Sequence, residues 1–200
     1  YDNISNQTIH ISSKKNIKKN IEENKIKKLL INHGFHEVIN NPFVKENTKE
    51  SIVIDNPLDS NKKYLRTNLK NSLVENLVFN ERRQKESIKL FEIADLYSSK
   101  ARSGKRVLGI IASGRVDKNY LDFSKIINKK YLERILSKLN SSNTKIIDIP
   151  RNSLESKSKN PVIYCEIEID SSIEIDFAYD EIKIQDIDFN SYDPISEFPS

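Results

Sequence analysis

Residues 64–97 are the most informative stretch of this sequence: YLRTNLKNSLVENLVFNERRQKESIKLFEIADLY. In its first half, leucine recurs every fourth residue at Leu69, Leu73 and Leu77, which predicts a helix over residues 68–80 with one wide apolar face. The second half, residues 88–97, is apolar on both sides apart from Glu92 and Asp95, as expected of a central strand. The stretch therefore predicts a helix that leads into a buried strand.

Two more helices and several strands are expected outside this stretch. One helix covers residues 14–33 and ends at Gly34, the residue best suited to a left-handed C′ position, and another covers residues 122–139. The expected strands cover residues 35–44, 51–55, 105–113, 145–149 and 162–170. Helices set between groups of strands favour an α+β fold in which helices flank an antiparallel sheet.

The chain reads as one module within a longer protein. Residues 1–13 are polar and aperiodic and are expected to form a linker from a preceding domain. Residues 14–193 are expected to form the module itself, and residues 194–200 the start of a linker to a C-terminal domain.

Charge is distributed unevenly along the 200 residues. Residues 161–200 hold eleven acidic residues and one lysine, a net charge of −10, whereas residues 1–160 have a net charge of +14. This asymmetry has two explanations: a sequence generally rich in Lys, Asn and Ile, or a basic groove that contacts nucleic acid. The first is favoured, because arginines and aromatic residues do not alternate in the sequence as they do in base-stacking proteins.

Several classes of site are disfavoured by residue counts. The chain has one cysteine, three histidines and four glycines, which excludes an intrachain disulfide and a cysteine-rich metal site. His33 and His36 lack a third ligand nearby and are expected at the surface, and Cys165 is expected to be a small core residue. Glu92 and Glu166 are expected to pair with nearby basic residues. No apolar run reaches the ~20 residues of a membrane span, and we expect a protein of the reducing cytoplasm.

Six short motifs follow one another in an order that resembles the β subunit of bacterial-type phenylalanyl-tRNA synthetase. They are Tyr1-Asp2-Asn3-Ile4, Gly34-Phe35-His36-Glu37-Val38 with Pro42-Phe43-Val44, Leu65-Arg66-Thr67 with Leu90-Phe91-Glu92-Ile93, Asn80-Glu81-Arg82-Arg83-Gln84, Tyr164-Cys165-Glu166-Ile167 and Ile195-Ser196-Glu197-Phe198-Pro199. The resemblance implies the fold of the class II aminoacyl-tRNA synthetase catalytic core. One departure is the segment from Asn143 to Pro161, which is too short and too poor in glycine to supply the hairpin usual in this family.

The resemblance also implies that this module is not itself catalytic. Active class II modules hold ATP with one arginine in an Arg-x-Glu loop after the motif 2 strand and a second in a glycine-rich motif 3, because guanidinium binds phosphate in a bidentate way. Here the strand ending at Tyr97 continues as Ser98-Ser99-Lys100-Ala101-Arg102, and Gly-x-Gly-x-x-Arg is absent. Arg102 and Arg106 are weak substitutes, since no acidic residue follows at the required spacing. We therefore expect no catalytic, cofactor-binding or metal-binding residue in this chain.

The family further implies partners for the whole enzyme. These are an α subunit in an α2β2 heterotetramer, tRNA(Phe), ATP and Mg²⁺, with the magnesium site of the β subunit in a domain upstream of Tyr1. Arg66, Arg82 and Arg83 are the candidate interface or tRNA contacts, and local structural roles are the alternative for each. A module that binds tRNA backbone, and a divergent active module using Arg66 and Arg102, remain as other functions. A homodimer of the isolated piece is also expected.

Overall fold

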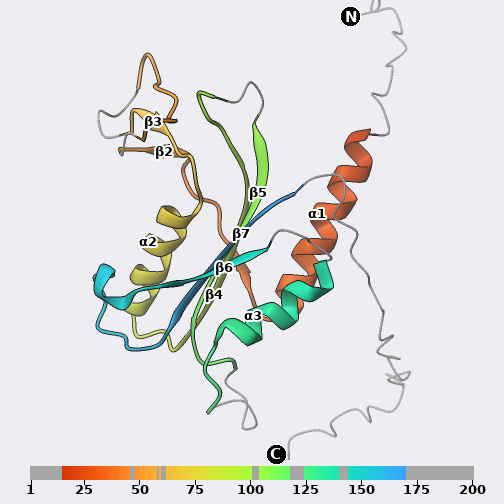
Figure 1. Cartoon of the computed structure of the whole chain (residues 1–200), viewed down its shortest axis with the longest axis vertical. Helices are drawn as coiled ribbons and strands as arrows, with labels where there is room; N and C mark the ends of the chain where they lie inside the picture. Colours follow the sequence, from red (N-terminus) through yellow and green to blue (C-terminus); the bar gives the residue numbers. More distant parts are fainter. Residues whose placement is uncertain are drawn as a thin grey trace, which may run out of the picture.

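The computed structural model describes residues 15–45, 48–57, 59, 62–100, 104–117, 124–139 and 144–169, with side chains from residue 22 onward. Its main sheet has five strands in the order β1-β4-β5-β7-β6 (Figure 1). Neighbouring strands are antiparallel except β1, which runs parallel to β4. The strands are β1 (His36–Glu37), β4 (Ser87–Leu96), β5 (Lys105–Gly114), β6 (Lys145–Ile149) and β7 (Val162–Glu168).

Helices α1 (Lys15–Asn32) and α3 (Lys129–Leu136) lie on one face of this sheet (Figure 1). Ile26 and Leu30 of α1 and Leu132 and Ile135 of α3 are almost fully buried in one hydrophobic cluster, together with Cys165 of β7. A short 3₁₀ turn, η1 (Ser137–Leu139), continues α3. The alternation expected along β7 is thus present, with Ile163, Cys165 and Ile167 facing these two helices.

Helix α2 (Lys70–Glu81) covers the opposite face. Leu69, Leu73 and Leu77 have no exposed surface, and they pack against Ile88 and Leu90 of β4, Val107 and Ile111 of β5, and Val162 and Tyr164 of β7. Each fully buried leucine contributes roughly 1.5–3 kcal/mol relative to an exposed one. Because both faces are covered, β4 and β5 are the buried central strands that their continuous apolar sequences predict.

A small second sheet lies beside the N-terminal end of α2. It consists of β2 (Phe43–Val44) and β3 (Tyr64–Leu65), which pair antiparallel, and Val53 forms an isolated bridge to Tyr64. A 3₁₀ turn, η2 (Arg151–Ser153), follows β6.

Three of the expected helices and strands differ from the structure in their bounds. The expected strand over residues 35–44 is two short strands, because Asn40-Asn41-Pro42 turns the chain and the Asn41 side chain accepts a hydrogen bond from the Phe43 N–H at 2.9 Å. The expected strand 51–55 is only the bridge at Val53. The helix expected over 122–139 begins at Lys129, since the extended Asn128 caps it by accepting the Tyr131 N–H at 2.9 Å.

The expected end of the first helix is confirmed. Gly34 has a φ of +78°, and its N–H and that of Phe35 donate to the carbonyls of Ile31 and Leu30. This is the left-handed closure that glycine permits without steric cost. The expected linkers at 1–13 and 194–200 lie outside the described residues.

Candidate functional site

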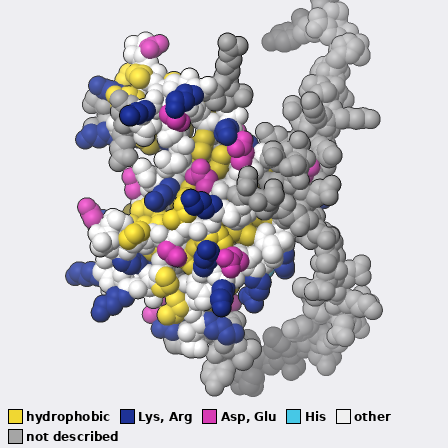
Figure 2. Space-filling model, viewed as in Figure 1, with side chains coloured by type: hydrophobic (Ala, Val, Ile, Leu, Met, Phe, Trp, Pro, Cys, Tyr) yellow, Lys and Arg dark blue, Asp and Glu magenta, His cyan; other side chains and the backbone are white. Residues whose placement is uncertain are grey.

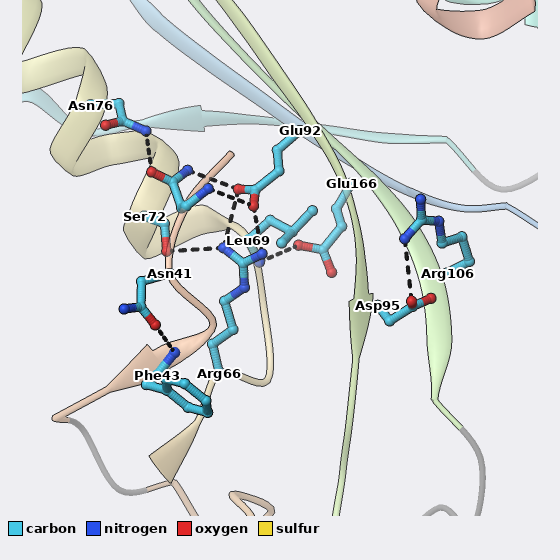
Figure 3. A network of polar contacts seen from close by, with 11 residues as sticks. Asn41, Phe43, Arg66, Leu69, Ser72, Asn76, Glu92, Asp95, Arg106 and Glu166 are labelled. Atoms are coloured by element: carbon cyan, nitrogen blue, oxygen red, sulfur yellow. Dashed lines mark hydrogen bonds and ion pairs between the residues drawn. The ribbon is translucent and has the colours of Figure 1, made fainter. Parts of the chain in front are cut away.

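A buried ion pair joins the segment before α2 to the centre of the sheet. Arg66 follows β3, and its guanidinium donates to both carboxylate oxygens of Glu92 on β4, at 3.1 Å from Nη1 and 2.5 Å from Nη2 (Figure 3). The two side chains are 5% and 3% exposed. Two parallel hydrogen bonds are the strongest arrangement that arginine makes with a carboxylate. The Arg66 guanidinium is therefore buried and paired, which favours a structural role for Arg66 over contact with a partner or tRNA.

Asn40 completes the environment of Glu92. Its backbone N–H and its side-chain amide donate to the two oxygens of Glu92 at 3.2 and 2.8 Å, and its side-chain oxygen accepts from Asn76 of α2 at 2.7 Å. Ser72 lies 3.4 Å from the Arg66 guanidinium. The four donors from Arg66 and Asn40 leave Glu92 fully engaged, so it holds the turn at Asn40, the corner at Arg66 and helix α2 together.

A second carboxylate, Glu166 of β7, holds the start of α2. It accepts the backbone N–H of Leu69 at 3.3 Å, where a helix presents unsatisfied donors and a partial positive charge (Figure 3). It also accepts the hydroxyl hydrogen of Tyr164, and burial together with this carboxylate raises the pKa of Tyr164. Both acidic residues are thus structural anchors of α2, and Glu166 is anchored by a backbone N–H and a tyrosine hydroxyl where a basic residue was expected.

Gly109 of β5 lies between these two carboxylates in the sheet. The strand register places Glu92 opposite Gly109 and Gly109 opposite Glu166. A Cβ on Gly109 would lie 2.9 Å from both Leu69 Cβ and Leu73 Cδ1, a distance shorter than normal contact. The missing side chain therefore allows α2 to lie directly on the sheet, and it leaves no space between them at this point.

Protein covers both faces of the central strands near Gly109. On the α2 face, the central strands present Glu92, Gly109 and Glu166 beneath fully buried leucines, and on the other face they are covered by α1 and α3. Glu92 is occupied by Arg66 and Asn40, and Glu166 by the Leu69 N–H and the Tyr164 hydroxyl. The residues at the centre of this sheet thus hold a helix in place of a ligand.

The loop after β4 is engaged in local contacts in its described part. Lys100 donates to Glu50 at 2.7 Å, and the hydroxyl of Ser98 lies 3.4 Å from the other oxygen of the same carboxylate. Arg102 lies outside the described residues. Arg106, the other candidate phosphate ligand, donates from Nε and Nη2 to the two oxygens of Glu23 on α1, both at 2.9 Å, and from Nη1 to Asp95 at 3.2 Å.

Arg106 therefore joins α1 to the sheet. The hydrogen bonds to Glu23, with further help from Asp95, raise its pKa above the ordinary value of arginine. Its side chain is 24% exposed and that of Glu23 is 12% exposed, so this ion pair is partly shielded from water. The geometry supports a structural role for Arg106.

Arg82 and Arg83 close α2, where cations suit the negative end of the helix. Arg82 pairs with Glu155 at 2.9 Å, and both side chains are largely exposed. Arg83 donates to the Phe79 carbonyl at 3.1 Å, and its guanidinium carbon lies 3.3 Å from the centroid of the Phe79 ring. Both arginines have local partners, but they remain at the surface and accessible.

The other candidates occupy ordinary positions. Cys165 is buried, and burial raises the pKa of its thiol to about 12, which makes it a poor nucleophile. The His33 ring bonds the Leu29 carbonyl oxygen through Nδ1 at 2.8 Å, and His36 is exposed. Among the described residues, no group of three His, Cys, Asp or Glu side chains is placed to bind a metal ion. No helix among them has the length and apolar character that crossing a membrane would require.

Sequence reasoning missed the roles of Asn40 and Gly109. In the sequence, Asn40 indicates only an interruption of a strand, and the residues around it do not point to a partner 52 residues away. Gly109 did have a signal, since a lone glycine in the apolar run Arg106–Ser113 is typical of close approach by another backbone or side chain.

One protein family matches this chain over most of its length. Residues 6–168 match the model of the phenylalanyl tRNA synthetase beta chain CLM domain. The phenylalanine–tRNA ligase beta subunit of Vibrio parahaemolyticus is 28% identical over 185 residues, covering 82% of this chain and 23% of that protein. The beta subunit of Fusobacterium nucleatum is 33% identical over 158 residues, covering 70% of this chain and 19% of that protein. The chain thus spans about a fifth of the length of these relatives.

Solved structures agree on the fold. Two structures of pyrrolysyl-tRNA synthetase from Desulfitobacterium hafniense superpose with TM-scores of 0.53 and 0.52, at 16% and 14% identity. They cover 74% and 75% of this chain, which covers 63% and 66% of them. The α+β fold resembling the class II synthetase core is therefore confirmed. Together with the match over residues 6–168, these observations show that the chain belongs to the phenylalanyl-tRNA synthetase beta chain CLM domain family.

Proposed function

We propose that this region is a non-catalytic, class II-like module of a phenylalanine–tRNA ligase β subunit that assembles with the catalytic α subunit. In this role it supports ATP-dependent charging of tRNA(Phe) in the cytoplasm by an α2β2 enzyme, and it makes no adenylate itself. Magnesium and ATP then bind elsewhere in the assembled enzyme.

The observation that carries the proposal is the covered sheet together with apolar side chains that remain exposed. Both faces of β4 and β5 are filled with protein, which supports a role without bound nucleotide. Four of the eight large hydrophobic residues that are exposed among the described residues fall within residues 31–53: Ile31 at 54%, Ile39 at 92%, Phe43 at 42% and Val53 at 61%. Hydrophobic side chains also reach the surface over β2 and β3 in Figure 2. The exposed Phe43 and Val53 both lie at the small second sheet, and exposed apolar side chains there are typical of a surface that a partner covers.

Arg102, one of the two arginines of the alternative active module, lies outside the described residues. The other, Arg66, and the further candidate Arg106 do not support that alternative. Each is already bidentate to a carboxylate, at Glu92 and Glu23 respectively. Binding a phosphate would require breaking an ion pair that is wholly or partly buried, and removing one partner of a buried pair costs about 3–5 kcal/mol.

Assembly can be tested by co-expressing the full-length β subunit with its α subunit. Ile39→Asp combined with Phe43→Asp should abolish co-purification, because two charges would be buried without partners at the contact. Ile147→Asp on β6 is the matched control, since Ile147 is also exposed, at 38%, but lies at the opposite end of the sheet order from β1. Retention of the α subunit by the double variant would disprove the proposed surface.

A further inference from the structure

A polar pocket lies between the small second sheet and the start of α2. Its volume is about 540 Å³, and its lining comes from both sides of β2, from the segment that leads into α2, and from the first turns of that helix. Asn41, Phe43 and Ser72 line the pocket and lie on one side of the Arg66 side chain, which also lines it (Figure 3). We call it the Arg66 pocket.

Arg66 has one hydrogen-bond donor that the folded chain does not use. Its terminal nitrogens, Nη1 and Nη2, donate to Glu92, whereas its Nε is buried and has no partner among the described residues. No other buried side-chain nitrogen or oxygen in the described part of the chain lacks a partner. A buried donor without an acceptor is unfavourable and rare in folded proteins. This N–H is therefore a point at which an oxygen atom of a ligand would bind.

The other charged groups of the pocket indicate what kind of oxygen this is. Lys45 and Lys62 line the pocket and are exposed, as is Glu75 of α2, the acidic residue among the described lining. A lysine ammonium and an arginine Nε–H can only donate hydrogen bonds, so they are complemented by a group that only accepts, such as a carboxylate. Two surface lysines are ordinary in a lysine-rich chain, and the specific evidence is the buried N–H.

A carboxylate suits this position better than a phosphate does. The Arg66 guanidinium is already shared with the carboxylate of Glu92, which would repel the second negative charge of a phosphate more strongly than the single charge of a carboxylate. Phe43 and Val44 give the pocket an apolar side, and Phe43 is 42% exposed. Small-molecule pockets of about 300–1,000 Å³ combine such apolar walls with a few polar groups.

We propose that the Arg66 pocket binds a small organic carboxylate. One carboxylate oxygen accepts the Arg66 Nε–H, Lys45 and Lys62 balance the negative charge, and the hydrocarbon part packs on Phe43. The ion pair with Glu92 stays intact, because it uses the other two nitrogens, so Arg66 keeps its structural role. This site goes beyond the proposed assembly role and does not require the α subunit.

The test compares benzoate with benzamide, which has the same ring and nearly the same size but no charge. Both are titrated by ligand-observed NMR against the full-length β subunit with any subunit that co-purifies with it. Benzoate should bind in the millimolar range, and benzamide about tenfold more weakly. Lys45→Gln combined with Lys62→Gln should weaken benzoate binding about fivefold and leave benzamide binding unchanged, because the lost attraction is electrostatic.

The matched control is Lys145→Gln combined with Lys159→Gln. It removes the same charge from exposed positions that do not line the pocket, and it should change benzoate affinity by about twofold or less. Absence of benzoate binding would overturn the proposal, since solvent would then be the acceptor of the Arg66 Nε–H. Equal affinity for benzoate and benzamide would also overturn it, as would equal weakening by the two lysine pairs, because net charge alone would then explain binding.

Discussion

The ion pair between Arg66 and Glu92 shows how one residue can look functional in sequence and be structural in the fold. Arginine at a helix entrance is well placed to bind an anion, and here the anion is a carboxylate 26 residues later on β4. Because the pair is almost completely buried, it contributes to stability only when both partners are present.

We therefore predict that Arg66→Leu destabilises the protein by about 3–5 kcal/mol, because Glu92 would lose its counter-charge inside the core. Chemical denaturation of the purified protein measures this loss. Lys105→Gln, which breaks an exposed pair with Glu168, is the control and should leave the unfolding midpoint nearly unchanged. If Arg66→Leu lowers the stability no more than this control does, the result contradicts a structural role for the Arg66–Glu92 pair. Arg66→Met with Glu92→Leu should recover part of the lost stability.

Residue positions were predictable where neighbours in sequence determine them. Cys165 was expected in the core because it alternates with Ile163 and Ile167, and it is buried with them. Gly34 was expected to end a helix and does so. The partners of Arg66 and Asn40 could not be derived, since they come from residues brought near only by folding of the sheet.

At the scale of elements, two carboxylates hold helix α2 against the sheet, and a glycine in the sheet makes room for it. Glu92 and Glu166 bind its entrance, and Gly109 lets Leu69 and Leu73 approach the strand. Each of these three sheet residues acts on the same short segment.

Gly109→Ala should destabilise the protein by about 1–3 kcal/mol, because the added methyl would meet Leu69 and Leu73 at 2.9 Å and push α2 outward. Unfolding by urea measures the change. In combination with Leu73→Val, the cost of Gly109→Ala should shrink, since the smaller side chain makes room. Strictly additive effects of the two substitutions would contradict a direct contact.

The boundaries of elements were less predictable than their existence. The helix expected from residue 122 begins at Lys129, because Ile126 and Ile127 fit helical spacing but belong to a segment that bridges Arg115 and is capped by Asn128. Ile127 is buried although it lies in this extended segment, whereas Ile126 is 47% exposed, so helical spacing alone does not locate the start of the helix.

At the scale of the described molecule, helices cover both faces of the central strands, and the strand order could not be derived from the sequence. An antiparallel sheet was expected, yet β1 runs parallel to β4 at one edge and β6 lies outside β7 at the other. The sequence of a two-residue strand such as β1 does not indicate which strand it pairs with. Its pairing depends on the turn at Gly34, which redirects the chain after α1.

For the assembled enzyme, we predict that a photoreactive azido analogue of ATP labels the α subunit and leaves residues 15–169 of this chain unlabelled. The reason is that α2 covers one face of β4 and β5, and α1 and α3 cover the other. Mass spectrometry of the digested complex locates the label, and excess unlabelled ATP controls for chance reaction. A labelled peptide from residues 87–117 would contradict the prediction.

The close seating of α2 over Gly109 also limits what protein engineering could achieve here. Introducing the two phosphate-binding arginines of active modules would add positive charge but would not make room for a nucleotide. Leu69 and Leu73 already occupy the space above Gly109 of β5. Making room for a ligand there would require displacing α2 and replacing Glu92 and Glu166, the two carboxylates that hold its entrance. Single substitutions would therefore not open a ligand site above β5 at Gly109.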